Sequence, residues 1–222
     1  MVESPRFQYH RAFNIIDGEM LMQINPADLS TRELYSWMVR LITPRPIAWV
    51  STVSAAGIPN LAPFSFFNGV GANPPTIVFC PANNRHGQPK DTLVNIRQTG
   101  QFVVNLVTEI DAQPMNLSSS ELDADVDEFD FASVDKASCQ RVSPPRVAQA
   151  SAAMECELVE AITLGTGPGG ANLVIGRILW LHLDQRLFDE QGQFDAKRLD
   201  TIGRMGGQDY VRTRDRFSLP RP

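Results

Sequence analysis

The chain has few cysteines, and their spacing does not match a metal-binding or disulfide pattern. Its three cysteines are far apart and include no CxxC pair: Cys80, Cys139 and Cys156. An odd number at such spacing predicts neither a disulfide framework nor a zinc site, so we expect reduced, mostly buried thiols. His10, His86 and His182 are equally scattered, and we expect His182 to face outward from a strand. The sequence therefore predicts no metal centre.

Long hydrophobic runs and surplus positive charge are also missing. No run approaches the roughly 18–20 apolar residues that span a bilayer, and the N-terminal MVESPRFQYHRAF lacks the apolar core of a signal peptide. The 222 residues carry a formal net charge of −5, whereas nucleic-acid-binding proteins show clustered surplus Lys and Arg. We therefore expect a cytoplasmic protein that binds neither membrane nor nucleic acid.

Two short motifs are incomplete copies of known sites. Residues 165–170 satisfy GxGxxG, but Pro168 and the strand-like residues that follow exclude the helix on which a dinucleotide phosphate would lie, so we expect a hairpin turn. Asp123, Asp125 and Asp127 imitate the start of an EF-hand, yet Glu128 replaces the required glycine. Neither a Rossmann site nor a calcium site is predicted.

The composition of the chain is that of one folded domain, because 43% of its residues are hydrophobic and 20% are charged. Residues 1–28 read as an arm, and residues 29–222 as the domain. Short β-rich runs separated by turn signals predict strands at 47–53, 60–67, 76–80, 102–107, 154–164 and 173–187. The intervals 57–59, 69–75 and 165–170 are predicted turns, and the polar residues 118–145 a surface loop.

Two helices are predicted between these strands. Ser30 and Glu33 have the spacing of a capping box, which predicts a helix over 31–40. Asp91 is expected to cap a second helix, which Gly100 would end. Because neighbouring strands follow one another with short links, the pattern favours an antiparallel barrel over a parallel sheet.

Three segments carry the residues that suit a bound ligand. In ITPRPIAWVST, two prolines restrict the backbone around Arg45, and Ser51 and Thr52 offer hydroxyl donors, an arrangement that suits an anion. The alternative is the rigid start of a strand with a surface arginine. In PNLAPFSFFNGVG, small and aromatic residues alternate, so a flat ring could lie there, although the phenylalanines equally suit a barrel core.

The third segment is the start of the second predicted helix. Lys90 and Thr92 flank Asp91 there, with Arg85 and His86 just upstream. Free backbone amides, the helix dipole and the lysine charge would together attract a phosphate. The alternative is a plain aspartate cap beside an exposed lysine. Ser65 has no nucleophile elbow and no evident histidine partner, so covalent catalysis is not predicted.

Taken in order, these motifs resemble the flavin reductase-like family of FMN-binding split barrels, which includes flavoredoxins and small flavin reductases. The similarity covers about residues 40 to 215, through TPRPIAWVST, PNLAPFSFFNGVG, KDTLVNIRQTGQFVVNLV, DEFDF, MECELV and IGRMGGQDYVRT. It implies a mainly β fold, a six-stranded antiparallel split β-barrel of Greek-key type with a few short peripheral helices. It also implies a homodimer with FMN near the subunit interface.

The resemblance further implies which residues hold the cofactor. Polar contacts to FMN would come from Arg45, Ser51, Thr52, Ser65, Lys90 and Thr92. The flavin ring would be lined by Pro46, Ile47, Ala62, Phe64 and Phe66. Further contacts are expected from Asn68, Arg85, Asp91, Gly206 and Tyr210. Because the cofactor carries the chemistry, no catalytic side chain is expected.

The implied activity is hydride transfer from NADH or NADPH to flavin, which would then reduce free flavin, a metal complex or a partner such as a monooxygenase or redox protein. Two alternatives remain open at this point. One is a flavoredoxin-type electron carrier without its own nicotinamide site, and the other is a split barrel that serves as a non-catalytic binding module.

Overall fold

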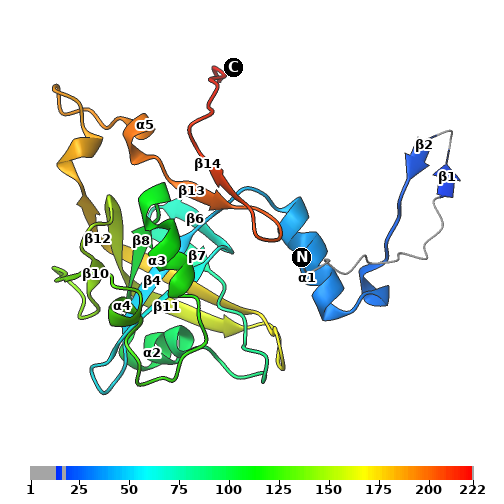
Figure 1. Ribbon diagram of the computed structural model, residues 1–222, viewed down its shortest axis with the longest axis horizontal. Coiled ribbons are helices and arrows are strands. Elements are labelled where there is room, and N and C mark those ends of the chain that lie inside the picture. Colours follow the sequence, from blue (N-terminus) through cyan, green and yellow to red (C-terminus); the bar gives the residue numbers. More distant parts are fainter. Residues whose placement is uncertain (1–13, 17–18, 222) are drawn as a thin grey trace, which may run out of the picture. The chain divides into compact units, whose positions relative to one another are not determined.

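The computed structural model describes residues 14–16 and 19–221 and divides the chain into two compact units, Met1–Met38 and Val39–Pro222 (Figure 1). The division therefore falls ten residues beyond the predicted end of the arm. In the first unit, β1 (Asn14–Ile16) pairs antiparallel with β2 (Glu19–Leu21), and η1 (Pro26–Asp28) follows. His10 lies outside the described residues.

The predicted first helix is confirmed as α1 (Thr31–Leu41). Its N-terminus is held by the capping box, because the Ser30 amide and hydroxyl both donate to the Glu33 carboxylate, at 2.9 and 2.7 Å. The Glu33 amide donates back to the Ser30 hydroxyl at 3.3 Å. Both side chains thereby satisfy amides that have no partner inside the helix.

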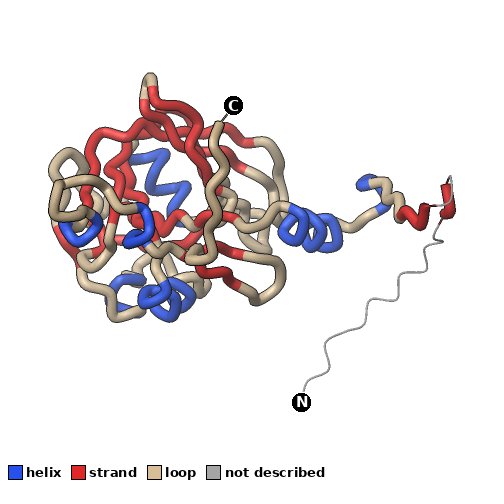
Figure 2. Tube along the Cα trace, turned by 90° about the horizontal axis from the view of Figure 1, so that it is seen from above, coloured by secondary structure: helices blue, strands red, loops and turns tan. Residues whose placement is uncertain are grey.

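The second unit is built on one antiparallel sheet of seven strands in the order β5-β4-β8-β11-β12-β7-β6. Figure 2 shows these strands as the curved body of this unit. The split-barrel prediction is confirmed, with seven strands in place of six. The strands are β4 (Ala48–Val53), β5 (Pro59–Phe64), β6 (Phe67–Ala72), β7 (Pro75–Phe79), β8 (Gln101–Leu106), β11 (Ala152–Thr163) and β12 (Asn172–Leu183).

The extra strand is β6, which forms where part of a turn was predicted. The single strand predicted over 60–67 divides into β5 and β6, and Gly69 lies inside β6 opposite Ile77 of β7. A register shift between Gly69 and Gly71 marks a bulge, a position at which glycine is common. The glycines were therefore misread as a turn, although their backbone groups are paired in a strand.

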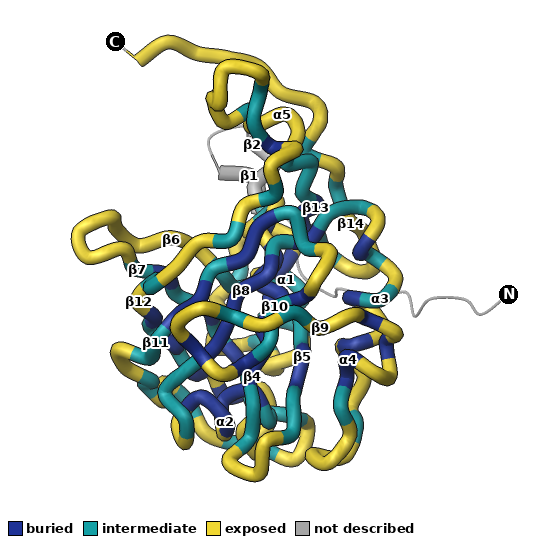
Figure 3. The backbone as a smooth tube through the Cα atoms, turned by 90° about the vertical axis from the view of Figure 1, so that its left-hand side faces the viewer, coloured by how far each residue is buried: buried dark blue, intermediate teal, exposed yellow. Residues whose placement is uncertain are grey.

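The barrel core lies on one face of β4 and its neighbours. Alternation along β4 directs Ala48 and Val50 into a cluster with Phe79 and Phe102, all of them buried. Figure 3 shows the central strands around β8 in the dark blue of buried residues. The opposite face also packs, because Trp49 lies in a second cluster that includes Leu61, Phe129, Val147 and Ile202.

The second cluster explains how the polar residues 118–145 fold. They were predicted to form a surface loop, and much of that segment is exposed. It also contains α4 (Glu128–Phe131) and β9 (Lys136–Ala137), which pairs with β10 (Arg146–Val147). Phe129 of α4 is fully buried against the sheet. Phe129, together with buried Ala132 and Val134, thus holds a largely polar segment onto the barrel.

Two helices pack on the sheet near its ends, α2 (Asp91–Thr99) and α3 (Ala112–Leu117). The second predicted helix is thereby confirmed, and Gly100 follows α2 in the left-handed conformation at φ 71°. Its cap is corrected, because Lys90 and not Asp91 is the N-cap residue. A small sheet, β14-β13-β3, joins β3 (Arg45–Pro46) to β13 (Ile202–Arg204) and β14 (Tyr210–Arg212).

The remaining short helices are η2 (Glu109–Asp111), η3 (Gln185–Leu187) and α5 (Ala196–Leu199). The GxGxxG segment forms the turn between β11 and β12, as predicted. In the part of the chain that the structure describes, no helix is both long and apolar enough to cross a membrane.

The three cysteines and His182 all lie in the part of the chain that the structure describes. All three cysteines are free thiols, and Cys156 is buried while Cys80 and Cys139 are half-buried. The prediction that His182 faces outward is wrong. Its Nε2 atom lies 2.5 Å from Oε1 of Glu155, whose side chain is fully buried, because this face of β12 is covered by the loop that precedes β10.

Candidate functional site

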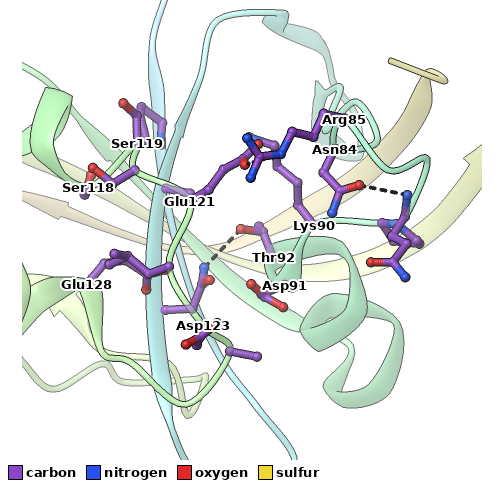
Figure 4. Close-up of a pocket in the computed structure, with 18 of the residues that line it drawn as sticks. Asn84, Arg85, Lys90, Asp91, Thr92, Ser118, Ser119, Glu121, Asp123 and Glu128 are labelled. Atoms are coloured by element: carbon purple, nitrogen blue, oxygen red, sulfur yellow. Dashed lines mark hydrogen bonds and ion pairs between the residues drawn. The ribbon is translucent and has the colours of Figure 1, made fainter. Parts of the chain in front are cut away.

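A pocket of about 400 Å³ lies where β5, the N-terminus of α2 and two loops meet (Figure 4). One loop is 84–90 and the other is 118–124, with Glu128 of α4 between the second loop and β5. Five of the residues expected to bind a cofactor line this pocket: Ala62, Arg85, Lys90, Asp91 and Thr92. In the view of Figure 4, Arg85 and Lys90 lie on one side, and Asp123 and Glu128 on the other.

Helix α2 is fixed to the sheet by two buried side-chain hydrogen bonds. The amide of Asn60 on β5 donates to the Thr92 hydroxyl at 3.0 Å, and the Asn95 amide on α2 donates to the Thr52 hydroxyl on β4 at 3.1 Å. Because Thr92 accepts in its bond, its own hydroxyl proton remains to be donated. The wall of the pocket therefore presents a hydroxyl donor held in a fixed position.

The N-terminus of α2 has the properties of an anion site. Its N-cap residue, Lys90, makes no side-chain hydrogen bond to the helix. The Leu93 and Val94 amides donate to the Lys90 carbonyl at 2.9 and 3.1 Å, so the amides without an acceptor in the helix are those of Asp91 and Thr92, and the helix dipole is positive at this end. The Lys90 ammonium lies 5.9 Å from the centre of the Phe64 ring and adds a full charge. Amides, dipole and ammonium together favour a bound phosphate or carboxylate.

The loop over residues 118–124 forms a wall of the pocket that the sequence did not predict. The Ser118 hydroxyl accepts from the Trp49 indole at 2.9 Å and donates to the Met115 carbonyl at 2.9 Å. Ser119 and Ser120 likewise donate to carbonyls at the end of α3. These serines hold the loop in place, and their hydroxyl protons are not left for a ligand. The run of three serines is the one local signal that could have indicated a helix end here.

An ion pair joins the two loops at the mouth of the pocket. Arg85 Nε lies 3.3 Å from the Glu121 carboxylate, and both side chains are more than half exposed. An exposed pair of this kind contributes little to stability. We infer that Arg85 can exchange Glu121 for another anion at low cost.

Glu128 supplies a buried carboxyl group to the same pocket. Its side chain accepts a hydrogen bond from the Leu61 amide at 3.0 Å. Burial is the main cause that raises the pKa of this carboxyl to about 7; the carboxylates of Asp91 and Asp127 act in the same direction, and hydrogen bonds from the Leu61 and Glu128 backbone amides act against it. The group therefore gains or loses its proton close to neutral pH.

Replacing Glu128 with glutamine should change how stability depends on pH. The carboxyl has a higher pKa in the folded chain than its ordinary value of 4.5, so the folded state binds the extra proton. Its stabilising effect is complete below pH 4.5 and is lost as the pH rises through about 7. Urea unfolding from pH 5 to pH 8 should show a fall in stability that is smaller in Glu128→Gln. Identical slopes for the two proteins would contradict this placement of the proton.

Arg45, the centre of the first predicted segment, lies outside the pocket. Its guanidinium is 4% exposed and donates to the carbonyls of Val39, Ile42 and Met205, at 2.6, 2.7 and 3.0 Å. Its Nε atom donates to the Ser65 hydroxyl at 3.2 Å. The side chain therefore joins separate segments of the fold, and its predicted contact with FMN stays a prediction.

The two hydroxyls at the end of the same segment are also used inside the protein. Ser51 donates to the Pro145 carbonyl at 2.6 Å, and Thr52 accepts from Asn95 of α2. Both side chains are fully buried. Ser51 thereby holds the loop before β10 against β4, and Thr52 holds α2 there; neither side chain lines the pocket.

The other expected contacts are spread over the barrel. Ile47 and Phe64 are buried in the two core clusters, while Pro46 is exposed. Phe66 lies near Arg45, and Asn68 is exposed and accepts from the Gly69 amide. Tyr210 is half-exposed beneath the Arg204 guanidinium, and Gly206 lies against Arg40. Their contact with a flavin ring stays a prediction.

The chain is similar to known proteins over most of its length. The model of the flavin reductase like domain matches residues 38–203. An uncharacterized protein of Halalkalibacterium halodurans is 36% identical over 204 residues, covering 90% of this chain and 97% of that protein.

Two solved structures are similar over the same region. Nitrilotriacetate monooxygenase component B from Bacillus cereus superposes with a TM-score of 0.84 and 32% identity, over 90% of this chain and 100% of that one. The 2-nitrobenzoate 2-nitroreductase NbaA of Pseudomonas fluorescens gives a TM-score of 0.81 and 32% identity, over 90% and 96% of the two chains.

Proposed function

The chain belongs to the flavin reductase-like domain family, and from this premise we propose that it binds FMN and catalyses hydride transfer from NADH or NADPH to flavin. The observation that carries the proposal is the uncapped N-terminus of α2, with Lys90 and Thr92, in the wall of the pocket. A partner monooxygenase is the proposed destination of the reduced flavin, since a similar protein is component B of such an enzyme. We also propose that the chain acts as a homodimer.

The residues of the pocket fit a flavin phosphate. A helix N-terminus with a neighbouring lysine is a common phosphate site, because amides, dipole and ammonium all favour the dianion. The volume of about 400 Å³ lies in the range of ligand sites, roughly 300–1,000 Å³. Half-buried Ala62 and Pro63 of β5 supply an apolar wall beside the polar end.

Each element of the pocket has a separate role in this proposal. Lys90, the Thr92 hydroxyl and the backbone amides of Asp91 and Thr92 hold the phosphate, and Arg85 supplies a second positive charge at the mouth. When bound, FMN supplies the centre that accepts hydride. The loop over 118–124 covers one side of the pocket and limits access of water. Glu128 takes up a proton as negative charge enters the pocket, because a nearby anion favours its neutral form.

Replacing Lys90 with methionine tests the phosphate assignment. Affinity for FMN should fall about 10- to 100-fold, because a hydrogen bond to a charged group contributes about 1.5–3 kcal/mol. Affinity for riboflavin, which has no phosphate, should be unchanged. Fluorescence titration with each flavin measures both.

A matched control is Arg97→Met, which removes one positive charge from the last turn of the same helix. Arg97 is exposed and donates to the Thr163 hydroxyl outside the pocket, so FMN affinity should remain that of the unmodified chain. An equal loss in both variants, or an equal loss for riboflavin in Lys90→Met, would contradict a phosphate contact at Lys90.

Anaerobic titration of the FMN-loaded protein with NADH and NADPH tests the activity. Loss of the oxidised flavin absorbance with either nucleotide is the expected result. A protein that binds FMN but stays oxidised until a protein donor is added would instead be an electron carrier. Failure to bind FMN would leave a binding module and would refute the proposal.

A further inference from the structure

Three side chains with metal-binding donor atoms meet outside the pocket. Cys139 Sγ, a carboxylate oxygen of Glu155 and a ring nitrogen of His182 all lie within 4.8 Å of one another. They come from three different segments: the loop after β9, strand β11 and strand β12. Because the segments are far apart in sequence, no short spacing motif predicts this cluster.

The sheet holds two of these residues on the same face. Ala153 is paired with His182 and Glu155 with Trp180, so Glu155 and His182 are diagonal neighbours across β11 and β12. The register shift directly after Glu155 marks a bulge, a feature that re-aims side chains. His182 Nε2 lies 2.5 Å from Glu155 Oε1 as a result.

The third residue is fixed by the loop that crosses this face. The amides of Gln140, Arg141 and Val142 all donate to the Glu155 carboxylate, at 2.7, 2.6 and 3.1 Å. Cys139 directly precedes them, so its thiol is placed beside the same carboxylate. Amides that hold a carboxylate in one orientation are typical of the outer shell of a metal site.

The charge of Glu155 also favours a cation here. Its side chain is fully buried, and the His182 ring beside it carries a positive charge only when it is protonated. Arg141, the arginine of the loop, directs its guanidinium over the Trp180 ring at 5.3 Å instead. A buried carboxylate is costly unless a positive charge compensates it, which a divalent ion would do.

We propose that Cys139, Glu155 and His182 form a binding site for a borderline divalent metal ion of the Zn²⁺ type. Thiolate, imidazole and carboxylate together select Zn²⁺ over Mg²⁺ or Ca²⁺, which prefer oxygen ligands alone. Tetrahedral Zn²⁺ with bonds of about 2.0–2.3 Å separates its ligand atoms by roughly 3.3–3.8 Å. The Glu155 and His182 donor atoms, 2.5 Å apart, must separate by about 1 Å to reach this spacing, and Cys139 Sγ lies within 4.8 Å of both.

The partial exposure of the site supports access for the ion. The His182 side chain is 19% exposed and Cys139 is half-buried, so an ion can enter without unfolding the barrel. Three protein ligands leave the fourth position of a tetrahedral ion open to water. A bound ion would join the loop over 139–142 to β11 and β12, and the site does not depend on the flavin proposal.

Metal binding by the purified full-length chain tests this inference. After dialysis against a chelator, equilibrium dialysis with Zn²⁺ should give one equivalent per chain. Co²⁺ in its place should give the thiolate-to-metal absorption band expected of a cysteine ligand. Cys139→Ser should abolish that band and weaken Zn²⁺ binding by at least about 100-fold, more than the roughly 10- to 100-fold that loss of an outer-shell partner costs.

Two further variants complete the experiment. His182→Gln should weaken Zn²⁺ binding in the same way, which guards against a folding defect peculiar to the serine variant. Cys80→Ser removes another half-buried thiol that lies outside the cluster, and it should change neither the stoichiometry nor the cobalt band. Binding well below one equivalent, or one equivalent that survives both Cys139→Ser and His182→Gln, would overturn the proposal.

Discussion

Replacing Arg45 with methionine is expected to lower the free energy of unfolding by about 3 kcal/mol or more, since each buried acceptor left unsatisfied costs about 1–3 kcal/mol. The guanidinium is 4% exposed, and its loss would leave the carbonyls of Val39, Ile42 and Met205 without this donor. Methionine fills a similar volume, so the effect comes from lost hydrogen bonds. Urea unfolding of the flavin-free protein measures it.

Arg85→Met is the matched control for this experiment. Both arginines were predicted from the sequence to contact FMN, but the Arg85 side chain is 74% exposed and lines the pocket. We expect Arg85→Met to keep the unfolding midpoint and to weaken FMN binding. If Arg45→Met instead kept the midpoint and lost FMN, Arg45 would be the phosphate ligand after all.

Replacing Gly176 with alanine is expected to be the second severe change. The added Cβ would lie 2.3 Å from Cζ of Phe102, a ring that is fully buried and packs on Phe79 at 5.5 Å between centres. Overpacking a core costs about 1–3 kcal/mol and occasionally more, and this contact is too short to relax without moving the ring. The urea midpoint should fall accordingly.

The control for this change is Gly69→Ala on β6. An added Cβ there meets no atom within 4 Å, so the midpoint should hardly move. The double variant Gly176→Ala with Phe102→Leu should be more stable than the sum of its single changes predicts, since the smaller side chain relieves the contact. Strict additivity would show that the ring and Gly176 do not meet.

The parts of the fold that could be predicted from sequence are those with local signals. The capping box predicts helix α1, and two β-rich runs around a glycine-rich turn predict the β11–β12 hairpin. Strand β6 was missed because its glycines carry the signal of a turn. Their pairing with β7 depends on a strand that follows them, which propensity does not report.

The residues of the candidate site likewise divide into those with a local signal in the sequence and those without one. Lys90 and Thr92 were predicted because a helix N-terminus is a local feature. Arg45 was predicted as a ligand contact, but its partners include a carbonyl 160 positions away, so its burial could not be read from neighbouring residues. The wall over 118–124 depends on Trp49 reaching Ser118 across the fold. His182 was predicted to face outward because alternation alone does not show what covers a strand.

The two hydrogen bonds that attach α2 to β4 and β5 have a thermodynamic consequence for binding. Thr92, Asn60, Asn95 and Thr52 are all buried, so the first turn of α2, the proposed anion site, is ordered when the barrel folds. A ligand that arrives there loses its own freedom but does not have to organise the helix, which favours affinity. In the proposed site, affinity for an anion would therefore depend partly on asparagine side-chain amides that do not contact the ligand.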